Sequence, residues 1–167
     1  MIKLIQNFLD IIMLRKGPDI IPSSWLVFLV AFSLLILSSS SVILLIESPS
    51  NQSPLINLLA YFGGILFYGG VLAFYGYFDR ALQTITAIVA CGSLITIAFV
   101  LEFIFFAPFI GKNFASLIAS VIMLWSIPVE GHIIAFAIER KRFFGIAIAI
   151  LALCFQFFLQ IQMSHPI

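Results

Sequence analysis

Three ionisable residues, Glu102, Glu130 and His132, lie inside long apolar stretches of the sequence. Ionisable groups are costly in hydrocarbon, so they tend to mark proton relays, ion paths or substrate sites. Glu130 is the strongest candidate, because its position along a spanning helix places it about 12 Å from the inner membrane surface. Glu102 lies roughly 30 Å from that surface. We therefore expect Glu102 to be a solvated acid at the outer interface, within reach of Lys112.

These residues do not form a recognisable catalytic pair. The two acids differ by roughly 18 Å in depth, whereas paired carboxylates of hydrolases lie about 5–10 Å apart. Glu130 and His132 point about 200° away from each other, because they are two residues apart on a helix. The sequence has no H-E-x-x-H, G-x-S-x-G or C-x-x-C motif, and we expect Cys91 and Cys154 to be small buried hydrophobes. We predict no enzyme activity, cofactor or metal.

A proline close to Glu130 is expected to shape the helix around it. Pro128 removes one backbone hydrogen bond and should kink the helix. Ser126 shares the helix face of Glu130, and Tyr68 and Ser93 lie at similar depth on other stretches. Two interpretations stay open for this polar group. We favour a structural hydrogen bond made by a protonated Glu130 over a site that handles a proton or a cation.

Composition assigns the chain to the membrane proteins. Of its 167 residues, 63% are hydrophobic and 9% are charged, and the mean hydropathy is +1.22. A soluble domain of this size could not bury so much apolar surface. Five apolar runs reach the ~20 residues that cross a bilayer. We predict an all-α polytopic helix bundle, a single domain over residues 1–167, with spans at about 25–46, 55–78, 82–106, 114–138 and 143–161.

Residues 1–14 form a separate pattern that is too short to span. Polar residues recur at the spacing of one helix face, opposite an apolar face. The polar set is Lys3, Gln6, Asn7 and Asp10, and the apolar set is Ile2, Ile5, Leu9 and Ile12. We expect an amphipathic helix that lies in the interface plane and docks on the cytoplasmic face. The segment lacks the features of a cleaved signal peptide.

Basic residues predict the orientation of the chain. If the five runs cross in turn, seven basic residues fall on one side: Lys3, Arg15, Lys16, Arg80, Arg140, Lys141 and Arg142. Only Lys112 falls on the other. This asymmetry predicts a cytoplasmic N-terminus and a periplasmic C-terminus in a bacterial cytoplasmic (inner) membrane. The net charge of +1 gives no field that would attract nucleic acid.

The second apolar run repeats tyrosine and glycine every seven residues. Tyr61, Tyr68 and Tyr75 form one such series. The glycines of the repeat, which we expect to mediate helix packing, are Gly63, Gly69, Gly70 and Gly76. A tyrosine-lined path is the alternative for this run. We likewise interpret the four serines at 38–41 as packing residues.

Three stretches carry a family resemblance: "LRKGPDIIPSS" before the first run, "LQTITAIVACGSL" in the third, and "EGHIIAFAIERKR" in the fourth. These stretches resemble a group of uncharacterised bacterial inner-membrane proteins. The layout of the chain, with five spans, a cytoplasmic N-terminal segment and short loops, looks like the related Yip family of small membrane proteins. The resemblance implies a non-enzymatic membrane protein and supplies no site residues.

The function that we expect is a scaffold, assembly or regulatory role in the lipid bilayer, with a membrane protein partner or a second copy of the chain. The alternative is a small transporter or channel subunit that uses Glu130. A small membrane enzyme is the third possibility. A conducting path would require polar residues from several spans to face one another.

Overall fold

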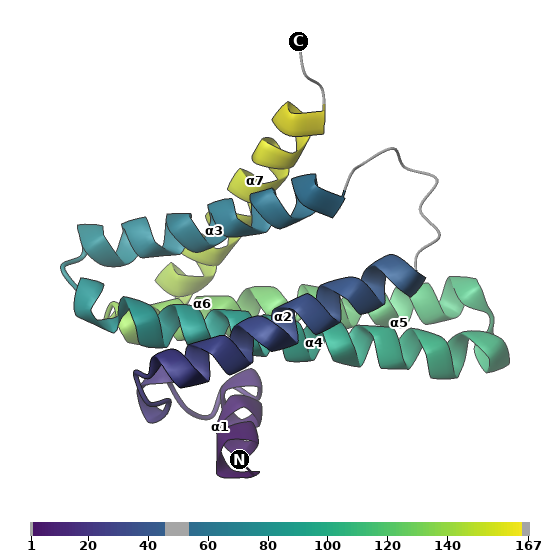
Figure 1. Cartoon of the computed structure of the whole chain (residues 1–167), viewed down its shortest axis with the longest axis horizontal. Coiled ribbons are helices and arrows are strands. Elements are labelled where there is room, and N and C mark those ends of the chain that lie inside the picture. Colours follow the sequence, from purple (N-terminus) through teal and green to yellow (C-terminus); the bar gives the residue numbers. More distant parts are fainter. Residues whose placement is uncertain (1, 46–53, 165–167) are drawn as a thin grey trace.

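The computed structural model of the chain describes residues 2–45 and 54–164. Every regular element in these two ranges is a helix. The helices are α1 (Ile2–Ile12), α2 (Trp25–Leu45), α3 (Pro54–Phe74), α4 (Ala81–Ile110), α5 (Lys112–Leu124), α6 (Ser126–Ala137) and α7 (Arg142–Ser164), with 3-10 turns η1 (Pro18–Ile20) and η2 (Phe78–Arg80) (Figure 1). Most of the first predicted joint and the last three residues of "QMSHPI" lie outside the described residues.

Within the described ranges, five helices are long and apolar enough to cross a membrane, with α5 and α6 together forming the fourth. The all-α prediction with five such helices is therefore confirmed. Two ends differ from the predicted ones. α3 stops at Phe74, because Gly76 takes a positive φ of 79° and η2 follows. α4 continues past Phe106 to Ile110, because Pro108 removes only one hydrogen bond in its final turns.

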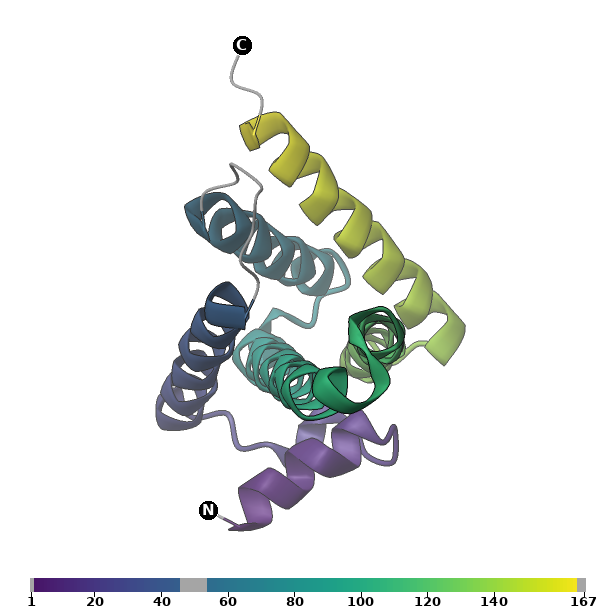
Figure 2. The same ribbon diagram turned by 90° about the vertical axis from the view of Figure 1, so that its right-hand side faces the viewer.

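The helices are arranged around the long hairpin of α4 and α5. α2 packs along α4, and α6 packs on both α4 and α7. α3 packs mainly on α7, so α3 and α7 form a pair above the layer that contains α2, α4, α5 and α6 (Figures 1 and 2). One end of the bundle holds η2 and the α6–α7 turn, where Arg80 forms an ion pair with Glu139 at 2.9 Å. We call this the basic end. The opposite end is the α4–α5 turn with Lys112.

Two glycines mark a close backbone contact between α6 and α7. A Cβ atom added at Gly145 would lie 1.9 Å from the carbonyl oxygen of Gly131, and one added at Gly131 would lie 2.7 Å from the Cα of Ile146. Only glycine fits at both positions, because the obstacles are largely backbone atoms. The sequence had not marked this pair as a packing contact.

The glycines that were predicted to pack are mostly elsewhere. Gly63 does contact α7, since its added Cβ would lie 2.4 Å from Leu159. Gly69 and Gly70 have no atom within 4 Å of an added Cβ, and Gly76 lies in the turn after α3. Gly63 thus lies against α7, and the described residues supply no close neighbour for the other three. The repeat of seven marks a helix face but does not show whether a neighbour lies against it.

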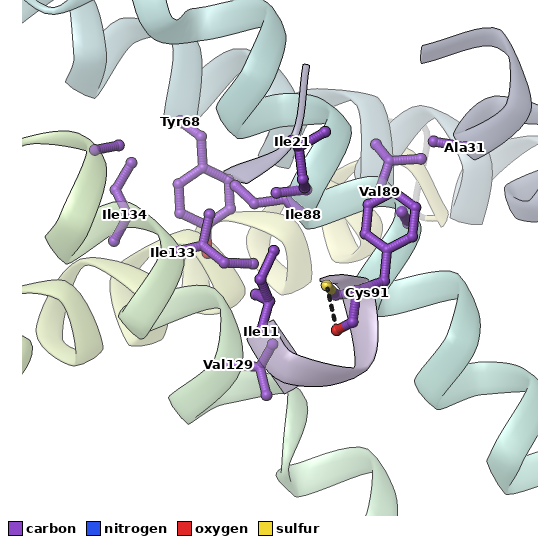
Figure 3. Close-up of a cluster of buried hydrophobic side chains, with 14 of the residues drawn as sticks. Ile11, Ile21, Ala31, Tyr68, Ile88, Val89, Cys91, Val129, Ile133 and Ile134 are labelled. Carbon is purple, nitrogen blue, oxygen red and sulfur yellow. Dashed lines mark hydrogen bonds between the residues drawn. The ribbon is translucent and has the colours of Figure 1, made fainter. Parts of the chain in front are cut away.

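α1 lies across α4 and α6, and its inner face completes the core (Figure 3). Phe8 and Ile11 are 3% and 0% exposed. Cys91 donates a hydrogen bond from its sulfur to the Phe8 carbonyl at 3.8 Å. Cys91 is ten residues into α4, so α1 docks about 15 Å beyond the first residue of that helix. The sequence had predicted docking on the cytoplasmic face without this position along α4.

Candidate functional site

The fourth apolar stretch breaks at Trp125, which separates α5 from α6. Pro128 lies three residues later and has no N–H to donate to the preceding turn. The neighbouring Val129 N–H reaches the Trp125 carbonyl only at 3.4 Å, a long hydrogen bond. The helix is thus interrupted at Trp125, five residues before Glu130. The kink itself stays a prediction.

Glu130 is bound by a tyrosine from α3. The hydroxyl of Tyr68 donates a hydrogen bond to Oε2 of Glu130 at 2.7 Å. Tyr68 is 1% exposed, so the side chains packed around its ring hold its hydroxyl in place. This bond joins the α3–α7 pair to α6, across 62 residues of sequence. It holds the carboxylate in one orientation and leaves Oε1 without a partner among the described residues.

Glu130 faces a cavity of about 550 Å³. Five spans contribute to the cavity wall, since α2, α3, α4, α5–α6 and α7 all supply side chains. About half of the lining residues are polar: Ser38, Ser39, Asn57, Tyr61, Ser93, Thr96, Ser126, Glu130 and Gln156. The rest are apolar or glycine, including Leu35, Val42, Ile95, Met123 and Leu153. Of the described residues that line the cavity, only Glu130 is charged.

The structure brings together four of the five residues that the sequence singled out. Glu130, Ser126 and Ser93 line the cavity, and Tyr68 holds Glu130. Pro128 is not a lining residue, and its role is limited to the break in the helix. The hydroxyl of Ser93 donates to the Val89 carbonyl at 2.7 Å, so its lone pairs remain free to accept.

Sequence reasoning missed most of the wall. Tyr61, one heptad before Tyr68, lines the cavity, and its hydroxyl lies 3.7 Å from a Cβ placed on Gly92. Ser38 and Ser39 belong to the serine run that was interpreted as packing. Both signals were visible in the sequence. Asn57 and Gln156 gave no signal, because single amides near the ends or middle of apolar runs are common.

The opposite face of the broken helix holds the N-terminal segment. Trp125 donates from Nε1 to the Ile12 carbonyl at 3.1 Å, and His132 donates from Nε2 to the Lys16 carbonyl at 3.1 Å. The Nδ1 atom of His132 is buried and has no partner in the described part of the chain. His132 therefore points away from Glu130, in agreement with their spacing, and it acts in docking.

Two other expectations are corrected. Both carboxylate oxygens of Glu102 are buried, and no described residue bonds to them, so Glu102 is not a solvated acid at a helix end. It does not line the cavity. Position along the helix alone could not show this burial. Cys91 is buried as expected, but Cys154 is exposed, because α7 presents it outward.

In the described residues, no group of three or more His, Cys, Asp or Glu side chains is placed to hold a metal ion. No family model, curated protein or solved structure matches the chain. The resemblance to the Yip family therefore stays a prediction from the layout and the quoted stretches.

Proposed function

We propose that the chain is an integral protein of a bacterial cytoplasmic membrane, with the basic end in the cytoplasm. The five long apolar helices support insertion. The described basic residues support the orientation, because Arg80, Arg140 and Arg142 lie at one end of the bundle and Lys112 lies at the other. The C-terminus is then periplasmic.

The N-terminal helix lies at the inner surface of that membrane. Its apolar residues divide into two sets: Phe8 and Ile11 contact the bundle, whereas Ile5, Leu9 and Met13 are exposed. The exposed apolar side chains are able to contact lipid. If α1 marks the interface, the part of α4 from Cys91 to Ile110 measures about 28 Å, close to the ~30 Å hydrocarbon thickness. Glu130 then lies close to the inner edge of the hydrocarbon.

We propose that the protein is a small transporter that binds its solute in the Glu130 cavity. The observation that carries this proposal is a carboxylate in a cavity to which each of the five spans contributes at least one polar residue. The sequence alone could not establish that these polar residues face one another across several spans. A purely structural acid does not require a cavity of about 550 Å³, a size that accommodates small organic ligands. The broken helix beside Glu130 is a feature that transport sites often use.

Cysteine accessibility tests this proposal. In a Cys154→Ala background, a membrane-impermeant thiol reagent should label Ser126→Cys in membrane vesicles, because Ser126 lines the cavity. The matched control is Leu124→Cys, two residues away on the exposed apolar surface, which should stay unlabelled in lipid. If both cysteines resist the reagent from either side of the membrane, the cavity is closed to water and the transporter proposal fails.

The scaffold role that the sequence favoured remains a second prediction. Affinity purification of the chain from its membrane tests it. A stoichiometric partner that also co-purifies with the Glu130→Gln variant would favour scaffolding over transport.

A further inference from the structure

The cavity also carries information about the class of solute, and this inference rests on the proposed function. We propose that the solute is an amphipathic primary amine, whose ammonium group binds at Glu130 and whose apolar body lies along the cavity wall.

The charge of the lining residues determines which sign of charge the ligand can carry. Among the described residues that line the cavity, Glu130 is the only charged one, and none of them is Lys, Arg or His. An anion would meet an uncompensated carboxylate without a cationic partner, which is unfavourable in a poorly solvated site. A cation neutralises that carboxylate.

Free hydrogen-bond acceptors on the cavity wall favour a ligand with N–H donors over a quaternary ammonium ion. Oε2 of Glu130 is occupied by Tyr68, but Oε1 has no partner among the described residues. Ser93 uses its hydrogen to bond Val89, so its oxygen is left as an acceptor. Three N–H donors of a primary ammonium match such acceptors, whereas a trimethylated nitrogen has none to offer.

The remaining wall defines the body of the ligand. Apolar side chains from several helices, such as Leu35, Ile95 and Leu153, line the cavity. Asn57 lies eleven residues before Tyr68 on α3, about 16 Å away along the helix. It also accepts a hydrogen bond from Gln160 at 2.5 Å. The described lining thus combines one carboxylate with apolar side chains and uncharged polar groups. An amine with an apolar body fits this composition.

The test uses three probes that differ only in the head group: 4-phenylbutylamine, 4-phenylbutanol and 4-phenylbutyrate. Their binding to the purified full chain is measured by calorimetry in one nonionic detergent at neutral pH. We expect the amine to bind at least tenfold more tightly than the alcohol or the acid. Glu130→Gln should bring the amine within about threefold of the alcohol. The matched control is Glu102→Gln, which changes an acid outside the cavity and should keep the full preference.

A second readout covers the case in which Glu130→Gln fails to fold. The amine should slow thiol labelling of Ser126→Cys at least fivefold in the Cys154→Ala background, and the acid should not.

The outcomes separate this inference from the transporter proposal. Tighter binding of the alcohol or the acid, or protection of Ser126→Cys by these alone, would overturn the amine class and leave a ligand-binding cavity in place. Unchanged amine affinity in Glu130→Gln would likewise overturn the assignment of Glu130. If none of the probes binds and none protects Ser126→Cys, the amine class is overturned, whereas the transporter proposal depends on whether that cysteine is labelled at all.

Discussion

Gly145→Ala should destabilise the bundle strongly, because it introduces a methyl group at the close backbone contact between α6 and α7. The new Cβ would lie 1.9 Å from the Gly131 carbonyl oxygen and 2.6 Å from the Cβ of Ala135. Ordinary contact starts at 3.4 Å, so α6 and α7 would have to separate by about 1.5 Å. The obstacle is backbone of the neighbouring helix, which cannot rotate away as a flexible side chain could.

The expected magnitude follows from the size of that separation. Overpacking of this kind costs about 1–3 kcal/mol. A gap of 0.5–1 Å also forfeits roughly a quarter to a half of the local dispersion energy. We therefore expect the upper part of that range, about 3 kcal/mol. In a chain of this length, that lowers Tm by roughly 6–12 °C.

Gly69→Ala is the matched control for this prediction. Gly69 also lies within a helix, but an added Cβ there meets no atom within 4 Å. Alanine is favoured over glycine in helices by about 1 kcal/mol, so this variant should be neutral or more stable. The measurement is thermal unfolding of both purified variants in nonionic detergent, followed by circular dichroism of the helices. Equal melting temperatures for Gly145→Ala and Gly69→Ala would refute the account of the α6–α7 contact.

Three further predictions concern the site and the topology. Glu130→Gln should have a Tm close to that of the wild type, because glutamine still accepts a hydrogen bond from the Tyr68 hydroxyl. Glu130→Leu should lose about 1–3 kcal/mol of stability, because that hydroxyl is left unsatisfied. Equal thermal stability of the two variants would contradict this. Spin labels at Leu9 and Gln6 should differ in contact with lipid, with Leu9 in the bilayer and Gln6 in water, and equal relaxation by a lipid-soluble reagent would remove α1 from the interface. A reporter that is active only in the cytoplasm should work at the N-terminus and fail at the C-terminus, and a cytoplasmic C-terminus would mean that one helix does not span.

The sequence predicted the helices well because hydropathy is a local signal. Five apolar runs gave five long helices, and Pro128 gave the break near Trp125. The group around Glu130 was also predicted in part. Depth along each helix placed Tyr68, Ser93 and Ser126 at the right level, and they do lie near Glu130.

The parts that the sequence could not predict depend on how helices face one another. The repeat of seven suggested Gly69 and Gly70 as packing residues, but no neighbouring atom lies close to either of them. The Gly131–Gly145 contact could be predicted only with the knowledge that α6 packs against α7. Glu102 was predicted to be solvated, but both of its carboxylate oxygens are buried, and such burial depends on how the helices pack.

The apolar face of α1 shows the same limit at a single helix. The sequence pattern assigns Ile5 and Leu9 to the apolar face, but the structure leaves both exposed and buries Phe8 and Ile11, which the predicted face did not include. Only the position of α4 and α6 decides which side of α1 is buried.

The central claim is that Glu130 lies in a cavity that solutes can reach, and the chain contains its own control in Glu102. A water-soluble carbodiimide with an amine nucleophile converts accessible carboxylates to amides, and peptide mass spectrometry of the wild-type protein in membranes locates them. The exposed Asp19 should react as an internal standard. We predict modification of Glu130, which lines the cavity, and none of Glu102, whose oxygens are buried. An unmodified Glu130, with Asp19 fully converted, would contradict the claim.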